Sequence, residues 1–446
     1  MIQVQFKKLR IPGFDKSVVY SFMGRGWLLL GGLVTSFLIA SNFSPELQGY
    51  YYAFNSLLAL TVFAELGLTS VLINFISHEW LHLRLGKQNA LLGDSHSVSR
   101  LISLSYFSKR WFMFAALFVV LALLVLGYIF WFDTNSLGIE WKLPWASLAI
   151  VTGLTMLFLP ISAVLEGCNQ LASLYKFRFI QYIVANIVGW LAIFLGADLW
   201  TASISSLAGL ITISLLSWLN YGPFLSRIFF SKPNLSCINW QKDILPMQWR
   251  IALSWIGGYF TFALFVPVLF RYHGPIVAGQ MGMTWAFIAA LMSISSAWIA
   301  PHGPTFGLLV ASKDFSELDK KFKNIFVVNI CLMLLGSLTL LTSIILLNYI
   351  YPELGARLLS PSITAIFLIG AVIYSMGLPI ATYLRAHKQE PLTQISIIGG
   401  LINGISVIFF GIKYGAMGIA IAYSASTIIA LPFLFKVFVT KRREWH

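Results

Sequence analysis

Long apolar stretches dominate this chain and fix the environment in which it can fold. A helix crosses a bilayer core with about 20 mostly apolar residues, at about 1.5 Å of rise per residue. Of the 446 residues, 58% are hydrophobic and only 10% are charged, and the mean hydropathy is +0.81. A soluble chain of this length could not hide so much apolar surface from water. The sequence therefore predicts an all-α polytopic membrane protein.

The apolar stretches predict about twelve transmembrane helices in two six-helix lobes around a central cavity. They lie at 18–40, 50–75, 111–132, 145–165, 180–195, 200–218, 251–270, 277–300, 325–349, 363–382, 395–412 and 415–435. The predicted domains are an N-terminal lobe at 1–221, a cytoplasmic linker at 222–250 and a C-terminal lobe at 251–446. Tryptophans at span ends, including Trp131, Trp145, Trp200 and Trp218, suggest an aromatic belt at the membrane interface.

The basic residues predict the orientation of the chain. The two termini and the even-numbered loops together carry 25 of the 30 Lys and Arg residues, and the odd-numbered loops carry 4. Such a bias marks the cytoplasmic side, so both termini are predicted to be cytoplasmic, in a multi-pass protein of a bacterial inner (plasma) membrane. The net charge of +14 is spread over these loops, which argues against a nucleic-acid partner.

The cytoplasmic loops are longer than the external ones. Segment 78–110 mixes Leu and Trp with charges and suggests an interfacial helix, and 312–323 predicts a capped helix that enters the ninth span. The external loops are too short to hold a catalytic domain.

Two pairs of motifs suggest a parallel internal repeat. Ser44-Pro45-x-x-x-Gly49 opens the second span, and Gly274-Pro275-x-x-x-Gly279 opens the eighth. Leu-Glu-Gly-Cys-Asn-Gln at 165–170 follows the fourth span, as Leu-Arg-Ala-His-Lys-Gln at 384–389 follows the tenth. Six spans per repeat bring both halves in from the same side, which is typical of transporters that handle substrate between two halves.

Ionisable residues inside spans are the first candidates for function. Arg25 lies roughly 10 Å from the cytoplasmic end of the first span, and Glu65 roughly 15 Å from that end of the second, at about 1.5 Å per residue. Arg25, between two glycines, could bind a phosphate, snorkel to the interface or pair with Glu65. Glu65 could couple transport to protons or simply orient Arg25.

Other polar residues complete the predicted substrate-binding set. Asn55 and Gln280 could line the cavity or join helices by hydrogen bonds, and Arg271 lies at the external mouth between the seventh and eighth spans. The sequence contains no Walker loop, zinc motif or serine-hydrolase elbow. We expect no catalytic residues, no metal site and no cofactor, and the choice between proton and sodium coupling stays open.

Several stretches resemble a known family. The segment from Leu47 to Leu60, continuing to Phe63-Ala-Glu-Leu-Gly-Leu68, resembles the second span of bacterial polysaccharide exporters. The stretch Ser295-Ser-Ala-Trp-Ile-Ala-Pro301, followed by Pro304 and 312–322, resembles the region that joins their eighth and ninth spans, and 165–170 fits the loop after their fourth. The family is the lipid-linked oligosaccharide flippases of O-antigen or capsule type, polysaccharide biosynthesis proteins within the multidrug/oligosaccharidyl-lipid/polysaccharide (MOP) exporter superfamily.

The resemblance implies alternating access between two lobes. The cargo would be an undecaprenyl-pyrophosphate-linked oligosaccharide, moved from the cytoplasmic to the periplasmic leaflet for surface polysaccharide such as the O-antigen of lipopolysaccharide. Arg25 would be the cation that holds the pyrophosphate, although cation-rich members have more than one. Expected partners are membrane lipids, a polysaccharide polymerase and chain-length proteins.

Two alternatives remain. A cation-coupled multidrug exporter of the same superfamily would need an acidic cavity, whereas the first span carries Arg25 and no carboxylate. A membrane polysaccharide polymerase or ligase would need periplasmic residues that activate glycan, and the short external loops argue against it.

Overall fold

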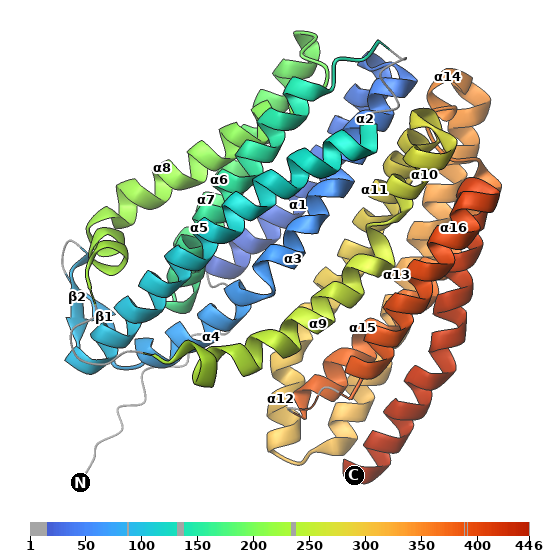
Figure 1. Ribbon diagram of the computed structural model, residues 1–446. Coiled ribbons are helices and arrows are strands. Elements are labelled where there is room, and N and C mark those ends of the chain that lie inside the picture. The colour runs from blue at the N-terminus through green and yellow to red at the C-terminus, as the bar shows by residue number, and fades with distance from the viewer. Residues whose placement is uncertain are drawn as a thin grey trace. The chain divides into compact units, whose positions relative to one another are not determined.

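The computed structural model describes residues 16–86, 89–131, 138–232, 238–387, 389 and 391–445, and in these residues it is helical apart from one short hairpin (Figure 1). The chain forms two compact units. Unit 1 comprises 1–35, 67–129 and 142–248, and unit 2 comprises 36–66, 130–141 and 249–446. The domain boundaries predicted from the sequence, at 221 and 251, stay a prediction. Residues 1–15 and 233–237 of those predicted domains lie outside the described residues.

Unit 1 is built from long helices and carries the hairpin. Its elements are α1 (Lys16–Asn42, the last turns of which belong to unit 2), α4 (Leu68–Trp80), β1 (Leu83–Leu85), β2 (Leu91–Gly93), α5 (Ser95–Trp131), α6 (Lys142–Gly167), α7 (Leu171–Phe194), α8 (Trp200–Phe230) and the π-helix η4 (Trp240–Ile244).

Unit 2 is all helical in its described residues. Its elements are α2 (Pro45–Leu58), η1 (Ala59–Thr61), α3 (Val62–Glu65), α9 (Leu245–Phe262, the first turn of which belongs to unit 1), α10 (Phe265–His273), α11 (Pro275–Ile299), η5 (Ala300–His302), α12 (Gly303–Ala311), α13 (Phe315–Ile350), α14 (Pro352–Gly355), α15 (Pro361–Ala386) and α16 (Thr393–Trp445).

The predicted fold class, an all-α polytopic membrane protein, is confirmed. Nine helices of the described residues are long and apolar enough to cross a membrane, or ten if the bent pair that runs from Pro45 to Trp80 is one span. The 53-residue α16 holds the two last predicted spans, separated at Gly415, and the seventh predicted span is the broken pair α9 and α10. The twelve predicted stretches are therefore mostly helical where the structure describes them, with breaks at 66–67 and 263–264.

Small and hydroxyl residues bring the helices of unit 1 together. A Cβ added to Gly189 of α7 would lie 3.2 Å from the side chain of Ser205 on α8, and the Ser205 hydroxyl donates to the Ala185 carbonyl at 2.9 Å. Lipid tails are as apolar as leucine, so close backbone approach and interhelical hydrogen bonds replace the hydrophobic effect here. α7 and α8 consequently pack along their length (Figure 1).

Buried polar side chains join the helices of unit 2. Asn329 on α13 accepts from the Ser295 hydroxyl of α11 and donates to the Ser375 carbonyl of α15 at 3.1 Å. All three residues are at most 1% exposed. In a site without water, each polar group must find its partner inside the protein, so this cluster fixes how three spans face one another.

The internal repeat has a structural counterpart. Ser44 caps α2 by accepting from Leu47 N–H at 3.2 Å, and Gly274 precedes α11, with a proline at the first turn of each helix. The second motif pair also matches, because α6 and α15 each carry an internal proline, Pro160 and Pro379, 219 residues apart like the motifs that follow them. Helices in equivalent positions of the two halves thus share a proline at the same place, in the first turn of α2 and α11 and within α6 and α15.

Segment 78–110, which the sequence suggests could include an interfacial helix, holds a hairpin before its helical part at 95–110, and an interfacial position for that part stays a prediction. α4 ends at Trp80, β1 and β2 pair antiparallel with Arg84 opposite Leu92, and α5 begins at Ser95. Leu83 and Leu91 are buried while Arg84 and Leu92 are exposed, so the segment alternates as a strand does. The predicted capped helix is confirmed, because the Asp314 carboxylate accepts from Glu317 N–H at 3.1 Å at the start of α13.

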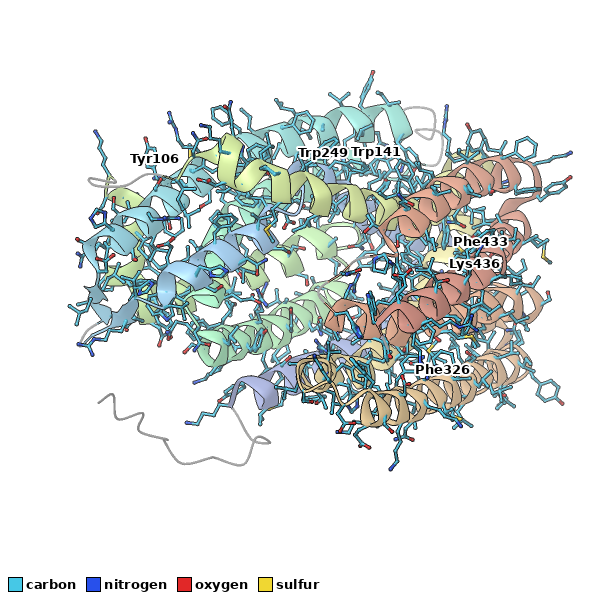
Figure 2. The ribbon with its side chains drawn as sticks, turned by 90° about the horizontal axis from the view of Figure 1, so that it is seen from below. Tyr106, Trp141, Trp249, Phe326, Phe433 and Lys436 are labelled. Atoms are coloured by element: carbon cyan, nitrogen blue, oxygen red, sulfur yellow. The ribbon has the colours of Figure 1, made fainter. Side chains whose placement is uncertain are left out.

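The surface of both units is apolar, as lipid requires. Tyr106, Trp249 and Phe433 are among many large hydrophobic side chains that are exposed (Figure 2). Two of the four tryptophans named for the aromatic belt are not at the surface, and the belt itself stays a prediction. Trp200 and Trp218 are exposed, but Trp131 and Trp145 are at most 1% exposed, which makes them core residues.

Candidate functional site

Arg25 projects from a helix whose face is fixed by its packing on α7. Gly24 of α1 lies against the Tyr182 ring, and the Trp190 indole N–H donates to the Thr35 hydroxyl at 2.8 Å. With one face of α1 held on α7, Arg25 is left exposed. It makes no ion pair and no hydrogen bond with any residue that the structure describes. Within the described part of the chain, its guanidinium thus has no counterion.

A second guanidinium lies in the same neighbourhood. Arg178 on α7 donates to the Ser162 hydroxyl at 2.7 Å and to the Glu166 carboxylate at 3.3 Å. Its guanidinium carbon lies 5.7 Å from the Tyr175 ring, and the charges of Arg25, Glu166 and Arg178 all act on the Tyr175 hydroxyl. Two cations and one carboxylate leave a net positive charge beside a phenol, which suits phosphate oxygens.

Sequence reasoning missed Arg178 as a candidate. It counted Arg178 as a loop charge, because the fifth span was predicted to begin at residue 180, whereas α7 begins at Leu171 and carries Arg178 within it. The available signal was Ser162 and Glu166, which lie four residues apart and so share a face of α6.

Glu65 is the last residue of α3, the helix that ends before the break in the second predicted span. The next two residues, Leu66 and Gly67, have φ of 50° and 67°, and α4 begins only after them. Glu65 is half-buried and belongs to unit 2, whereas Arg25 belongs to unit 1. The predicted pairing of Arg25 with Glu65, and a coupling role for Glu65, stay predictions.

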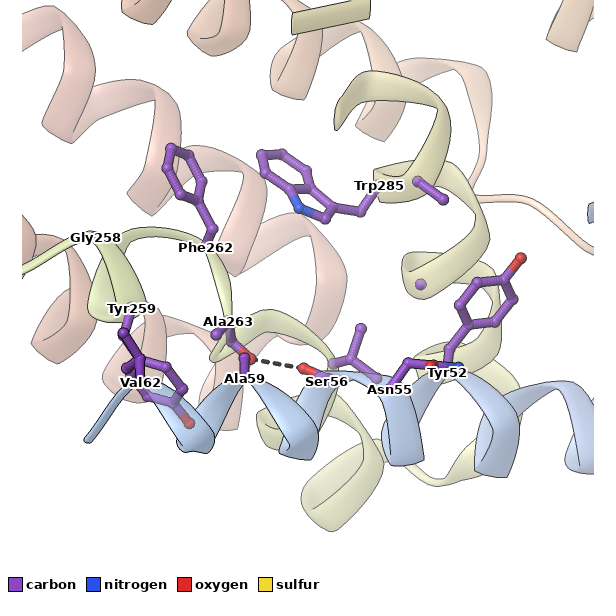
Figure 3. A pocket seen from close by; sticks show the side chains of 13 residues that line it. Tyr52, Asn55, Ser56, Ala59, Val62, Gly258, Tyr259, Phe262, Ala263 and Trp285 are labelled. Carbon is purple, nitrogen blue, oxygen red and sulfur yellow. Dashed lines mark hydrogen bonds between the residues drawn. The ribbon is translucent and has the colours of Figure 1, made fainter. Parts of the chain in front are cut away.

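Unit 2 contains a cavity of about 430 Å³ that lies between α2 and the helices α9, α10 and α11 (Figure 3). Four of the 13 lining residues are aromatic, namely Tyr52, Tyr259, Phe262 and Trp285. The others are Asn55, Ser56, Ala59, Val62, Gly258, Ala263, Val266, Gly282 and Ala286. None of these 13 residues carries a charge. Its volume falls in the range of about 300–1,000 Å³ that small-molecule sites occupy.

The polar groups of the cavity come from α2, α9 and α11, on Tyr52, Asn55, Ser56, Tyr259 and Trp285. The Asn55 amide donates to the Tyr51 carbonyl at 2.9 Å, which leaves its oxygen as an acceptor. Ser56 donates to the Ala263 carbonyl at 2.8 Å, at the break between α9 and α10, so its hydroxyl proton is already used. The structure thus places one of the residues predicted from the sequence, Asn55, in the wall of a cavity.

The two other predicted residues lie elsewhere in unit 2. The Gln280 amide on α11 donates to the Ala356 carbonyl at 2.9 Å, and Gln280 is not among the residues that line the cavity. Arg271 lies exposed in the last turn of α10. Among the described residues, no group of three or more His, Cys, Asp and Glu could hold a metal ion.

Comparison with known proteins identifies the fold. No protein-family model matches the sequence, and no curated protein matches it. Among solved structures, the lipid II flippase MurJ in an inward closed conformation superposes with a TM-score of 0.63 at 18% identity, over 95% of this chain and 89% of that chain. An inward-facing MATE multidrug resistance transporter of the MOP superfamily gives 0.64 at 12% identity, over 96% and 99%. An outward-facing MATE transporter gives 0.55 at 12%, over 95% of each chain. The chain therefore has the fold of MOP-superfamily transporters.

Proposed function

We propose that this chain, on a transporter fold of the MOP superfamily, is a flippase for an undecaprenyl-pyrophosphate-linked oligosaccharide. It moves the headgroup from the cytoplasmic to the periplasmic leaflet of a bacterial inner membrane, by alternating access of the lobes at 1–221 and 251–446. The observation that carries the proposal is Arg25, exposed and without a partner among the described residues, with Arg178 acting on the same neighbouring hydroxyl.

The physical need for such a protein is clear. A headgroup with phosphates and many hydroxyls would lose its hydration in about 30 Å of hydrocarbon, at a cost of several kcal/mol for each unpaired group. The prenyl tail can stay in the bilayer while polar side chains accompany the head. No covalent step is required. Two guanidiniums offset by one carboxylate would hold a pyrophosphate strongly enough to select it and weakly enough to release it.

A multidrug exporter is the second candidate, favoured by the aromatic cavity of unit 2. Rings such as Tyr52, Tyr259 and Trp285 attract organic cations through their faces. Against it, none of the 13 residues that line the cavity is acidic, and the exposed charge in the first span is a cation. An exporter of cations would concentrate the opposite charge in its binding site.

Transport in proteoliposomes tests the proposal. Purified protein should move a fluorescent undecaprenyl-pyrophosphate oligosaccharide across the bilayer, and Arg25→Ala should lower the rate by about ten- to a hundredfold, the loss of one charge-assisted hydrogen bond or two. Arg25→Lys should retain part of the rate, and Arg443→Ala, an exposed arginine near the C-terminus, should retain all of it. Export of organic cations by the purified protein, with no movement of the lipid-linked sugar, would establish the multidrug exporter instead.

A further inference from the structure

The cavity of unit 2 is chemically unlike the arginine cluster of unit 1, and we infer that it is a subsite for one uncharged sugar ring of the cargo. The inference rests on the proposed function for the identity of the cargo. The pyrophosphate would be held by Arg25 and Arg178, whereas the 13 residues that line the cavity supply aromatic rings and several uncharged polar groups and include no charged residue. That combination matches a pyranose, which has apolar C–H faces and a rim of hydroxyls.

Trp285 is the ring best placed to bind such a ligand. Its indole packs against Phe262 at 5.7 Å and 28°, and meets Phe265 and Tyr423 edge to face at 4.8 and 5.5 Å between ring centroids. These contacts hold the ring in one orientation before any ligand arrives, so little conformational entropy is lost on binding. The weakly positive C–H bonds of a sugar face would lie on the negative face of such a ring.

The polar groups of the cavity favour a hydroxylated ligand. Figure 3 shows Asn55 on the α2 wall, and the nitrogen-bearing edge of Trp285 turned toward that wall. The Trp285 N–H has no hydrogen-bond partner among the described residues, and the Asn55 oxygen accepts from none of them. A sugar hydroxyl could accept from the indole and another could donate to the amide. A hydrocarbon chain would leave both groups unpaired, which opposes its binding.

Gly258 is the position at which a larger side chain should fill part of the cavity. A Cβ added to Gly258 would have nothing within 4 Å, although this glycine lines the cavity. A larger side chain there would occupy the ligand's volume without displacing the protein. Gly399 is a matched control, because a Cβ there also has nothing within 4 Å and Gly399 lies in the same unit but does not line the cavity.

Binding of lipid-free probes to the full-length protein in nanodiscs tests the subsite. We expect methyl glycosides of common hexoses and N-acetylhexosamines to change the tryptophan fluorescence of the protein. Gly258→Val and Trp285→Leu should weaken this binding at least tenfold, whereas Gly399→Val should leave it unchanged. Trp285→Phe, which keeps an aromatic face, should retain part of the affinity and guards against a variant that does not fold.

Equal binding by Gly258→Val and the parent protein, at equal melting temperature, would overturn the inference. So would binding of tetraphenylphosphonium in place of every glycoside.

Transport by the same variants separates this inference from the proposed function. If Arg25→Ala stops movement of the lipid-linked oligosaccharide while Gly258→Val and Trp285→Leu transport normally, the flippase stands and the sugar subsite is wrong. If the parent protein binds glycosides but never moves the lipid-linked cargo, the flippase is wrong and the cavity is a sugar site of another transporter.

Discussion

Gly49 and Gly279 pack backbone against backbone where α2 crosses α11. A Cβ on Gly279 would lie 2.9 Å from the Gly49 nitrogen, and a Cβ on Gly49 would lie 2.0 Å from the Pro275 carbonyl oxygen. These two glycines close the Ser44–Gly49 and Gly274–Gly279 motifs, which the sequence identifies as a repeat. The equivalent residues of the two halves therefore meet each other, as they do when a two-fold axis passes between repeats.

Substitution of Gly49 tests this crossing. Gly49→Ala should destabilise the purified protein by about 1–3 kcal/mol, because neither backbone can move aside to admit the methyl group. The readout is the thermal melting temperature in detergent. Gly399→Ala is the control, since it adds a methyl group to a helix of the same unit where nothing lies within 4 Å. That variant should be neutral or slightly stabilised by better helix propensity. Equal melting of the two variants would refute the close packing.

Gly415 carries a second testable constraint. Its φ of 61° and ψ of −143° lie in a region that only glycine occupies readily, and there α16 changes from the eleventh predicted span to the twelfth. A straight helix of 53 residues would be about 80 Å long, far more than a bilayer can hold. Gly415→Ala should therefore cost about 1–3 kcal/mol, measured by thermal melting against Gly399→Ala. An unchanged melting temperature would mean that the chain does not turn at this residue.

Asp94 caps the N-terminal end of α5 and makes that end sensitive to pH. Its carboxylate accepts from Ser97 N–H at 2.9 Å, and chiefly this hydrogen bond lowers the pKa of Asp94 below its ordinary 3.8. A depressed pKa in the folded state contributes stability above the ordinary carboxyl value, and this contribution disappears as the pH falls through the folded value. The first turn of α5 should thus loosen only below about pH 4.

Hydrogen exchange followed by mass spectrometry measures this loosening. Relative to Asp94→Asn, which keeps a capping oxygen but cannot titrate, the parent protein should show extra exchange in the first turn of α5 at pH 3 and none at pH 6. Asp94→Ala should show extra exchange at both pH values. Extra exchange in the parent protein at pH 6 would contradict the depressed pKa.

The sequence predicts what depends on local length and turn chemistry, and misses what depends on how helices face one another. The twelve predicted stretches follow from apolar length, and Gly415 separates the last two where the pattern predicts a boundary. Trp285 and Tyr259 escaped attention because they lie in spans that are apolar on every side, where periodicity marks no face. Asn55 was found because a polar residue stands out in such a span, and Arg178 was missed because charge counting assigned it to a loop.

The hairpin was not predicted from the sequence for a different reason. Segment 78–110 has both leucines and charges, so composition alone suits an interfacial helix and a hairpin equally. The period-two burial of Leu83, Leu85 and Leu91, and the left-handed Asn89 in the turn, decide for strands. The Arg227 side chain of α8, which donates to the Leu91 carbonyl at 3.1 Å, supplies a tertiary contact that no local pattern reveals.

The predicted orientation can be tested with two matched cysteines. Asp198 lies between α7 and α8, and Lys313 lies between α12 and α13. Both are exposed and both have positive φ, 47° and 57°, so cysteine replaces them at equal backbone cost. In a background without Cys168, Cys237 and Cys331, a membrane-impermeant maleimide added to intact cells should label Asp198→Cys and leave Lys313→Cys unlabelled until the membrane is opened. Glu444→Cys, near the C-terminus, should behave like Lys313→Cys.

The reverse labelling pattern would mean that the protein is inverted in the membrane. Arg25 would then lie near the leaflet where the cargo is released, so that it could not receive a pyrophosphate made in the cytoplasm. Seven predicted spans separate Asp198 from Glu444, so the two positions must lie on opposite sides of the membrane. Labelling of both cysteines from the same side would contradict the predicted number of spans.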